Sequence, residues 1–401
     1  MDLQSDRAGA RAHDVDHLAR ATGVSGRAVA GGSAVGFSAG WNIADVGAVA
    51  DELAAVYGVS LGVIGLFTAV LFLVHMLMQL PAGRLSDRLG PGRVCAAGLA
   101  VMALGNAIAC VAPEPALALG ARALLGVGTA LGFIGGSDFV RASGGSPFAQ
   151  GLYGGLATAG GGVALAVVPA VEPSLGWRAP YATAIVVAVA AAAMLLAAPR
   201  VPRVTRGASD RTPVRALVRD GRLLRLGAVF AASFGLSVVI ANWVVTLLER
   251  ESALSSEAAG AIGALTLVLG VVSRPLGGWI LDRRPDRVRA AIVLAALAGA
   301  AGTLALTAGS TALAVAGALV VGLVAGISFA PAFTGAAALY PESPATAIGF
   351  VNASGAATIL AGTALAGAAF AAGAGVWSFA VLAVLWAASA LVTPAWRSPA
   401  G

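Results

Sequence analysis

Twelve apolar runs constrain the fold of this chain more than any other feature. They lie at about 28–50, 61–80, 94–112, 116–137, 149–171, 180–198, 226–248, 258–281, 290–308, 311–337, 345–371 and 376–396. Each is close to the roughly 20 residues that an α-helix needs to cross the hydrocarbon core of a bilayer. Helices are expected because they satisfy every backbone group internally, and the alternating pattern of a barrel strand is absent. The runs therefore predict an all-α membrane protein with twelve transmembrane helices.

The composition supports a protein that lies in a lipid bilayer. Of the 401 residues, 58% are hydrophobic and only 11% are charged, whereas about 25% of the residues of a soluble domain are charged. The formal net charge is +6, but no Lys occurs, and the Arg residues lie mostly in short segments between the apolar runs. We interpret this pattern as a membrane topology signal and expect no nucleic-acid partner.

The distribution of Arg predicts the orientation of the chain in the membrane. With the N-terminus inside, 21 of the 25 Arg residues fall in the tails and inner segments, and only Arg178 and Arg250 fall outside. The remaining two, Arg122 and Arg274, lie within apolar runs. Because inner segments carry the excess of basic residues, we expect both termini in the cytoplasm and a location in the inner (cytoplasmic) membrane of the cell. The expected state is a monomer.

The longest polar interruption, residues 199–225, divides the runs six and six. Its eight Arg residues are expected to form a solvated, orienting loop. The predicted organisation is a cytoplasmic N-terminal tail (1–27), an N-terminal six-helix bundle (28–198), a cytoplasmic linker (199–225), a C-terminal six-helix bundle (226–396) and a cytoplasmic C-terminal tail (397–401). The halves also repeat at an offset of 195, which relates Gly83, Asp87 and Arg88 to Gly278, Asp282 and Arg283. Internal repeats are common in secondary transporters.

The segment after the second run carries a family resemblance. We interpret residues 83–93, Gly-Arg-Leu-Ser-Asp-Arg-Leu-Gly-Pro-Gly-Arg, as a short loop. Gly83, Asp87, Arg88 and Gly90 match the loop signature of the major facilitator superfamily, although Pro91 and Gly92 replace the two basic residues that end that signature. Other stretches resemble further motifs of the family: residues 122–128 in the fourth run, Pro169 near the end of the glycine-rich fifth run, and residues 176–178 in the next outer loop.

The resemblance implies two six-helix bundles around a central cavity that opens alternately to each side of the membrane. It implies a secondary active transporter with a small-molecule substrate. It also implies a gating role, as a latch between helices, for the motif and its repeat: Gly83, Asp87, Arg88, Gly90, Asp282 and Arg283.

Three charged residues fall inside the predicted spans: Asp45, Arg122 and Arg274. A charge at the bilayer centre costs at least ~2.5 kcal/mol, so each is a functional candidate. Asp45 and Arg122 both lie about six residues, or ~9 Å, from the outer end of their runs, so they can meet. In many proton-coupled members of the resembled family an acidic residue on the first helix works with an arginine on the fourth, which implies that protons are partners and that protonation of Asp45 releases Arg122. Alternatively, Asp45 marks a ragged helix end and Arg122 is its structural partner.

One stripe of the first run is polar. Ser38, Trp41, Asn42 and Asp45 recur at helical spacing, so we expect this stripe to face the cavity and Trp41 and Asn42 to contact the substrate. Plain packing between helices is the alternative. His75, the only histidine within a run, is interpreted as a packed or hydrogen-bonded side chain rather than a proton carrier.

Arg274 lies deeper than a loop residue, and its planar fork of donors suits a carboxylate or another oxyanion. Residues 273–278 resemble the eighth helix of nitrate and nitrite porters, which pair such an arginine with one in the second helix. The equivalent position here is Gln79, and we assign Gln79 with Arg274 to substrate binding. The alternative is an arginine that reaches the cytoplasmic face or pairs in an inner gate.

These observations predict a secondary active transporter of a small solute, an anion, with proton coupling. A drug-like solute exporter of the same fold and a non-transporting membrane receptor are the alternatives. Residues 36–40 fit the Gly-x-Ser-x-Gly pattern of hydrolases, but Ser38 is mid-helix rather than on a strand-to-helix turn, so no enzyme is expected. We expect no cofactor and no metal, since neither a phosphate-binding loop nor a metal-ligand spacing occurs.

Overall fold

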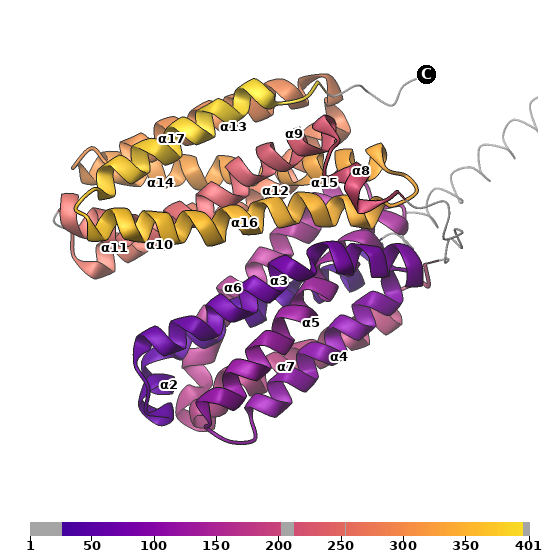
Figure 1. Cartoon of the computed structure of the whole chain (residues 1–401), viewed down its shortest axis with the longest axis horizontal. Helices are drawn as coiled ribbons and strands as arrows, with labels where there is room; N and C mark the ends of the chain where they lie inside the picture. Colours follow the sequence, from indigo (N-terminus) through magenta and orange to yellow (C-terminus); the bar gives the residue numbers. More distant parts are fainter. Residues whose placement is uncertain (1–25, 202–211, 253, 396–401) are drawn as a thin grey trace, which may run out of the picture.

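The structure, a computed structural model, describes residues 26–201, 212–252 and 254–395. Residues 1–25, 202–211 and 396–401, which hold most of the predicted tails and the centre of the predicted linker, lie outside this range. The described chain forms two helical bundles, one made by its N-terminal half and one by its C-terminal half (Figure 1).

The first bundle begins with a helix over residues 26–44. Two short helices follow, η1 (Val46–Val49) and α2 (Ala50–Tyr57). The other elements are α3 (Leu61–Leu89), α4 (Pro91–Ala109), α5 (Pro115–Ala142), α6 (Pro147–Leu175), the short η2 (Gly176–Arg178) and α7 (Ala179–Ala197).

The second bundle follows the short α8 (Val214–Leu217). Several of its membrane crossings consist of two helical segments in series: α9 (Gly221–Phe230) and α10 (Leu236–Glu251) joined by the π-helical η4 (Ala231–Gly235), α11 (Ser256–Val268) with α12 (Gly270–Arg283), and α14 (Thr311–Ala325) with α15 (Phe329–Leu339). The others are α13 (Val288–Ala305), preceded by the short η5 (Pro285–Arg287), α16 (Pro344–Ala371) and α17 (Gly375–Val392).

The helices account for twelve membrane crossings, as the apolar runs predict. Ten stretches of the described chain are long and apolar enough to cross a membrane, and one of them, Pro147–Ala197, contains both α6 and α7. The helix over residues 26–44 adds the remaining crossing.

Several helices start where the sequence supplies a cap and a proline. The Glu114 and Ser146 side chains accept hydrogen bonds from the backbone N–H groups of Ala116 and Ala149. A proline follows directly at the first position of α5 and of α6, where its missing N–H costs nothing. Local chemistry therefore defines these helix starts.

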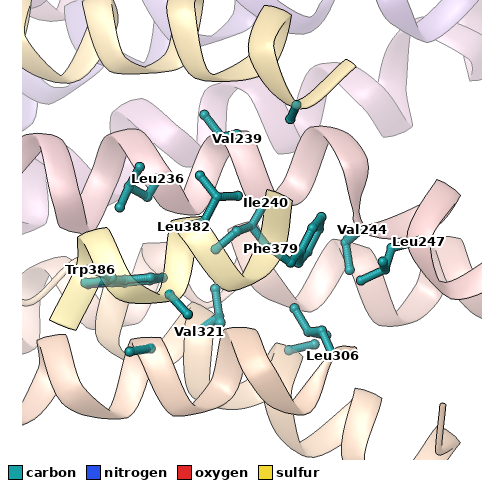
Figure 2. Close-up of a cluster of buried hydrophobic side chains, with 14 of the residues drawn as sticks. Leu236, Val239, Ile240, Val244, Leu247, Leu306, Val321, Phe379, Leu382 and Trp386 are labelled. Atoms are coloured by element: carbon teal, nitrogen blue, oxygen red, sulfur yellow. The ribbon is translucent and has the colours of Figure 1, made fainter. Parts of the chain in front are cut away.

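The second bundle is held together by apolar side chains. Figure 2 shows part of this core, in which Ile240 of α10 lies near Phe379 of α17, and to which Val239, Val244 and Trp386 also belong. All five are essentially inaccessible to solvent. Since lipid is as apolar as this core, close packing and not exclusion from water must hold the helices together.

The predicted loop at residues 83–93 is instead helical except at Gly90. α3 continues through Leu89 and α4 begins at Pro91, which leaves only Gly90 between them. Gly90 has φ of +87°, a conformation that glycine adopts without strain. The prediction was wrong because we ended the helix where the apolar run ends, whereas a helix can extend beyond the hydrocarbon core.

The bundles meet at one end of the molecule. We call the end near Ala198 and Asp220 the linker end and the opposite end, with α2 and η2, the far end. In Figure 1 the bundles lie together at the linker end, beside α8, and lean apart toward α2 and α11. Glycines permit the contact: Gly83 lies against the backbone of Ala345 in α16. In the same way Gly278 lies against the backbone of Pro147 in α6.

The described part of the linker also makes specific contacts. Arg84 of α3 donates to the carbonyl of Thr212 (3.2 Å), and the Thr212 N–H donates to Ser343 Oγ (3.2 Å). Leu217 of α8 is fully buried. The arginines of the described linker are exposed, as expected for a solvated segment: Arg200, Arg215, Arg219, Arg222 and Arg225. The expected loop is wrong in two places, because Val214–Leu217 forms α8 and the seventh crossing begins at Gly221, inside the predicted linker.

A tyrosine of the second bundle holds the start of α9. Tyr340 Oη donates to Asp220 Oδ2 (2.7 Å), and Asp220 Oδ1 accepts from the N–H of Arg222 (2.7 Å). Partial burial alone would raise the pKa of Asp220, but these hydrogen bonds outweigh it and lower that pKa below its ordinary value. The carboxylate form is thus favoured in the folded protein, and this contribution is lost as the pH falls through the lowered pKa.

A pair of glycines in α6 tests how tightly the first bundle is packed. A Cβ at Gly160 would collide with the backbone of Phe37 in the first helix, whereas a Cβ at Gly162 would meet nothing within 4 Å. We expect Gly160→Ala to destabilise the protein by about 1–3 kcal/mol, because the two helices must separate. The matched variant Gly162→Ala should be neutral or stabilising by up to about 1 kcal/mol from helix propensity. Thermal unfolding in detergent measures both, and equal melting temperatures would contradict the packing described here.

Candidate functional site

A buried ion pair links two helices of the first bundle. Arg122 Nη1 of α5 lies 2.9 Å from Oδ1 of Asp45, which directly follows the first helix. Both side chains are completely inaccessible to solvent. The guanidinium also donates to the carbonyl of Asn42 (2.8 Å) and, at 3.4 Å, to that of Phe67 in α3. The two residues that the sequence places at equal depth thus lie in contact, and Arg122 joins three helices.

Only one oxygen of the Asp45 carboxylate accepts hydrogen bonds from the described residues. Oδ1 accepts from Arg122 and from the N–H of Val46 (2.7 Å), whereas buried Oδ2 has no hydrogen-bond partner among the described residues. An unpartnered carboxylate oxygen away from water is costly. A proton on Oδ2 would remove the charge and so change the strength of the bond to Arg122. The pair therefore has the chemistry of a two-state electrostatic switch.

Ser38 and Asn42 do not face the space between the bundles, contrary to our prediction. Asn42 Oδ1 accepts from Nδ2 of Asn106 in α4 (2.7 Å), and the Ser38 hydroxyl points at the sulfur of Met102 in the same helix (3.9 Å). Both side chains are fully buried. Helical spacing defines a polar face but not the neighbour that the face meets, and here the neighbour is α4. Substrate contact by Asn42 is therefore not supported.

Trp41 packs within the apolar core of the first bundle. Its ring lies 6.1 Å from that of Phe37, its exposed fraction is 3%, and its Nε1 has no hydrogen-bond partner in the described part of the chain. The packing alternative therefore describes Trp41 in this conformation.

Arg274 lies in α12 at the contact between the bundles. Its Nη1 donates to the carbonyl of Gly154 in α6 (2.6 Å), and its guanidinium carbon lies 4.9 Å from the ring centre of Phe234 and 4.8 Å from that of Phe329. The side chain is 6% exposed, and no described carboxylate pairs with it. A buried guanidinium with in-plane donors and no counter-charge among the described residues has the chemistry to bind an anion.

Gln79 occupies the position in α3 that corresponds to Arg274 through the repeat. Its Nε2 donates to the carbonyl of His75 (3.1 Å), and its buried Oε1 has no partner among the described residues. His75 Nδ1 lies 3.0 Å from Thr129 Oγ1 of α5, which agrees with its interpretation as a hydrogen-bonded side chain. In the described chain no hydrogen bond joins His75 to Ser38.

The two repeat-related aspartates cap helices of the opposite bundle. Asp87 at the end of α3 accepts from the backbone N–H groups of Ala345 and Thr346 (both 3.0 Å) and from the Thr346 hydroxyl (2.5 Å) at the start of α16. Asp282 at the end of α12 accepts from the N–H of Phe148 at the start of α6 (2.8 Å). A carboxylate at a helix N-terminus satisfies free N–H groups and opposes the positive end of the helix dipole. Two related contacts therefore close the linker end.

The remaining motif residues lie around these caps. Arg88 and Arg283 are exposed at the linker end, each directly after its capping aspartate, and Gly90 ends α3. Gly83 forms the close backbone contact with α16.

Asp138 is a buried charge that the sequence analysis missed. It lies in α5 at 2% exposure, accepts from Ser86 Oγ (2.6 Å), and pairs with Arg141 (2.6 Å). Because Ser86 directly precedes Asp87, this network holds the end of α3 that carries the cap. The signal was the helical spacing of Asp138 and Arg141, which we overlooked because the apolar run ends at residue 137.

Comparisons with known proteins place the chain in a family. A family model described as the Major Facilitator Superfamily matches residues 30–363. The chain belongs to the major facilitator superfamily. It is accordingly a multi-pass membrane protein of the transporter type. No curated protein matches it significantly, and within the described residues no group of His, Cys, Asp or Glu side chains could hold a metal ion.

Solved transporters have a similar fold at low sequence identity. The Escherichia coli fucose:proton symporter FucP is 17% identical, with a TM-score of 0.69 over 90% of this chain and 97% of that one. The human organic anion transporter MFSD10 (TETRAN) is 17% identical, with a TM-score of 0.70 over 92% and 99%. The proton:xylose symporter XylE is 12% identical, with a TM-score of 0.71 over 92% and 95%. At these identities the likeness shows the fold alone.

The first prediction for this site concerns Asp87. Asp87→Asn removes the charge and replaces one acceptor oxygen with an N–H donor that faces backbone N–H groups. We expect the linker end to open more often, by about 1–2 kcal/mol or roughly five- to thirtyfold in the population ratio. Double electron–electron resonance between spin labels on residues 89 and 342, one on each bundle, measures the distance between the bundles at the linker end in a background without Cys95 and Cys110.

Substrate affinity for the open state should persist in Asp87→Asn, because Asp87 lies in no contact with Arg274. Asp286→Asn, an exposed change in η5 at the same end, is the matched control. An unchanged distance distribution together with a loss of substrate binding would contradict the latch.

Proposed function

We propose that this protein transports a small anion by alternating access, with the movement of the anion coupled to that of protons. Membership of the superfamily supports secondary transport. The observation that carries the choice of an anion is Arg274, a buried cation at the contact between the bundles that has no counter-charge among the described residues.

The contact of Arg274 with Gly154 suits an alternating-access mechanism. Arg274 belongs to the second bundle and Gly154 to the first, so the hydrogen bond between them changes when the bundles move. An anion would compete with the Gly154 carbonyl for the same donors. Substrate binding and separation of the bundles would then be linked, because a ligand shifts a conformational equilibrium only through different contacts in the two states.

The Asp45–Arg122 pair supports proton coupling. In the charged state the pair binds the first helix to α5. Protonation of Asp45 would leave Arg122 with two carbonyl acceptors, from Asn42 and Phe67, and so weaken one link while keeping the arginine hydrogen-bonded. The pair is sealed from solvent here, so proton exchange would need the other conformation.

A drug-like solute exporter is the second candidate. The aromatic rings of Phe234 and Phe329 beside Arg274 favour it, because they would accept an apolar solute. The two candidates differ in the solute they need: an anion transporter requires a negatively charged solute, whereas the exporter would accept a neutral one.

The orientation forms part of the proposal: both termini and the linker end face the cytoplasm of the inner membrane. A cysteine at residue 372, in the far-end segment after α16, should react with an impermeant maleimide added to intact cells lacking Cys95 and Cys110. A cysteine at residue 286 in η5, at the linker end, should react only after the membrane is opened. The reverse labelling pattern would overturn the orientation.

The coupling proposal predicts the behaviour of Asp45→Asn in proteoliposomes. The amide cannot release a proton, so uphill accumulation driven by a proton gradient should fall to the level seen without a gradient. Counterflow exchange should persist, because it needs only alternating access with substrate bound. Uphill transport at the wild-type rate would leave Asp45 with the structural role.

Two controls accompany Asp45→Asn. Asp51→Asn changes an exposed carboxylate in α2 and should leave accumulation unchanged. The double variant Asp45→Asn/Arg122→Gln removes both charges, so its counterflow separates loss of coupling from damage to folding by an unpaired buried arginine.

The anion proposal predicts the behaviour of Arg274→Lys. Charge is kept, but an ammonium cannot form the planar fork, so affinity for the transported anion should fall by about tenfold or more. Inhibition of uptake by a panel of small anions measures the change. Arg289→Lys, an exposed change at the start of α13, is the matched control. Wild-type affinities in Arg274→Lys would favour a gating role for this arginine.

A further inference from the structure

The charges inside the molecule limit the charge of the substrate. Four charged side chains are buried in the described chain: Asp45, Arg122, Asp138 and Arg274. The first two neutralise each other, and Asp138 pairs with Arg141. Arg274 thus remains as a single uncompensated positive charge between the bundles. A bound monoanion would neutralise it, whereas a dianion would bring one unpaired negative charge into the same low-dielectric space.

Aromatic rings surround this charge and continue across the contact between the bundles. Phe329 lies next to Arg274 and 4.3 Å from the ring centre of Phe333, and Phe230 lies 6.0 Å from Phe329. Phe333 of α15 then meets Phe133 of α5 edge to face, with 6.4 Å between ring centres. The last contact joins the second bundle to the first.

Separation of the bundles would break ring contacts such as that of Phe133 with Phe333. Phe329 and Phe333 are buried, at 1% and 0% exposure. A solute that enters beside Arg274 would therefore separate aromatic rings that now contact one another. An aromatic solute restores these contacts with its own ring, and each aromatic pair contributes beyond its buried area. A small inorganic anion would leave the rings apart.

The polar groups nearby are already bonded to one another. The Ser233 and Ser328 hydroxyls are hydrogen-bonded together, Tyr153 Oη donates to the carbonyl of Phe133, and Ser273 Oγ accepts from the N–H of Gly326 (3.0 Å). A polyhydroxylated solute such as a sugar would find few free partners here, and its unpaired hydroxyls would make its burial costly.

We propose that the substrate is an aromatic monocarboxylate, with its carboxylate on the in-plane donors of Arg274 and its ring against Phe234 and Phe329. This inference rests on the proposed function and names the substrate class of the same site. It commits to three properties that can be varied separately: one negative charge, a planar carboxylate, and an aromatic ring.

Thermal unfolding of the purified wild-type protein in detergent tests these properties with five probes. Benzoate should raise the melting temperature in a saturable manner, because a ligand of the folded state stabilises it. Benzyl alcohol, which lacks the charge, phthalate, which carries two carboxylates, cyclohexanecarboxylate, which lacks aromaticity, and nitrate, which lacks the ring, should each bind at least several-fold more weakly.

Substitutions place the effect at the site. Arg274→Lys should weaken benzoate binding by about tenfold, and Phe329→Leu by roughly two- to tenfold, the range for one aromatic pair. Phe234→Leu should act like Phe329→Leu and serves if the latter variant does not fold. Arg289→Lys and Phe379→Leu are the matched controls, since Phe379 is a buried ring of the second-bundle core away from Arg274.

The outcomes separate this inference from the proposed function. Binding of nitrate, dependent on Arg274, without binding of benzoate would overturn the substrate class and leave anion transport standing. Equal affinities for benzoate and cyclohexanecarboxylate, or benzoate binding that Arg274→Lys does not weaken, would also overturn the inference. Binding of none of the anions, with binding of benzyl alcohol, would overturn both proposals in favour of the exporter of neutral solutes.

Discussion

The cost of a charge in a medium that cannot solvate it governs the interior of this protein. A buried charge persists only when a counter-charge or several hydrogen bonds replace its water. Arg122 meets this condition with Asp45 and two backbone carbonyls, and Asp45 meets it with Arg122 and the N–H of Val46. Arg274 meets it only in part, with one carbonyl and two aromatic rings. The difference between these arginines separates a charge suited to switching from a charge suited to binding.

The same electrostatics, applied to helix ends, closes the linker end. Asp87 and Asp282 place their carboxylates on free N–H groups at the start of α16 and α6, each in the opposite bundle. Neighbouring Gly83 and Gly278 let the backbones approach closely enough for these contacts. Because the caps are few and lie at the edge of the membrane, they can break and reform without unpacking either bundle. An offset of 195 relates both pairs, which favours duplication as the origin of the two halves of the closure.

The sequence predicts most of the fold and less of the site. The number of crossings follows from apolar runs because each crossing must be long enough to span lipid. The ends of helices do not follow from the apolar runs, because α3 and α5 continue beyond the runs that predicted them. For this reason Asp87 was expected in a loop and the buried charge of Asp138 was missed. Similar distances from the outer ends of two apolar runs sufficed to place Asp45 and Arg122 together, although the first helix ends at residue 44 and Asp45 lies just beyond it. The direction of Asn42 could not be predicted, because a polar stripe does not reveal which neighbouring helix covers it. The rings around Arg274 come from segments 40 to 60 residues away in sequence, and no local pattern assembles them.

α3 connects the two kinds of electrostatic contact. Its Phe67 carbonyl accepts from Arg122, and its Asp87 caps α16 about 20 residues later, or about 30 Å along a continuous helix. Protonation of Asp45 would alter the hydrogen bond from Arg122 to the Phe67 carbonyl in one part of α3. The Asp87 cap would hold the other part of α3 against the second bundle. Coupling between sites requires an element whose position both sites bias, and α3 meets that requirement without any long-range charge interaction.

Gly154 of α6 adds a second route, since its carbonyl holds Arg274 and its helix carries the N-terminus that Asp282 caps. An anion that takes the donors of Arg274 from Gly154 would thus loosen the contact between α6 and α12. A proton on Asp45 would loosen the contact between the first helix and α5. Each ligand would therefore act on a different contact of the same closed state.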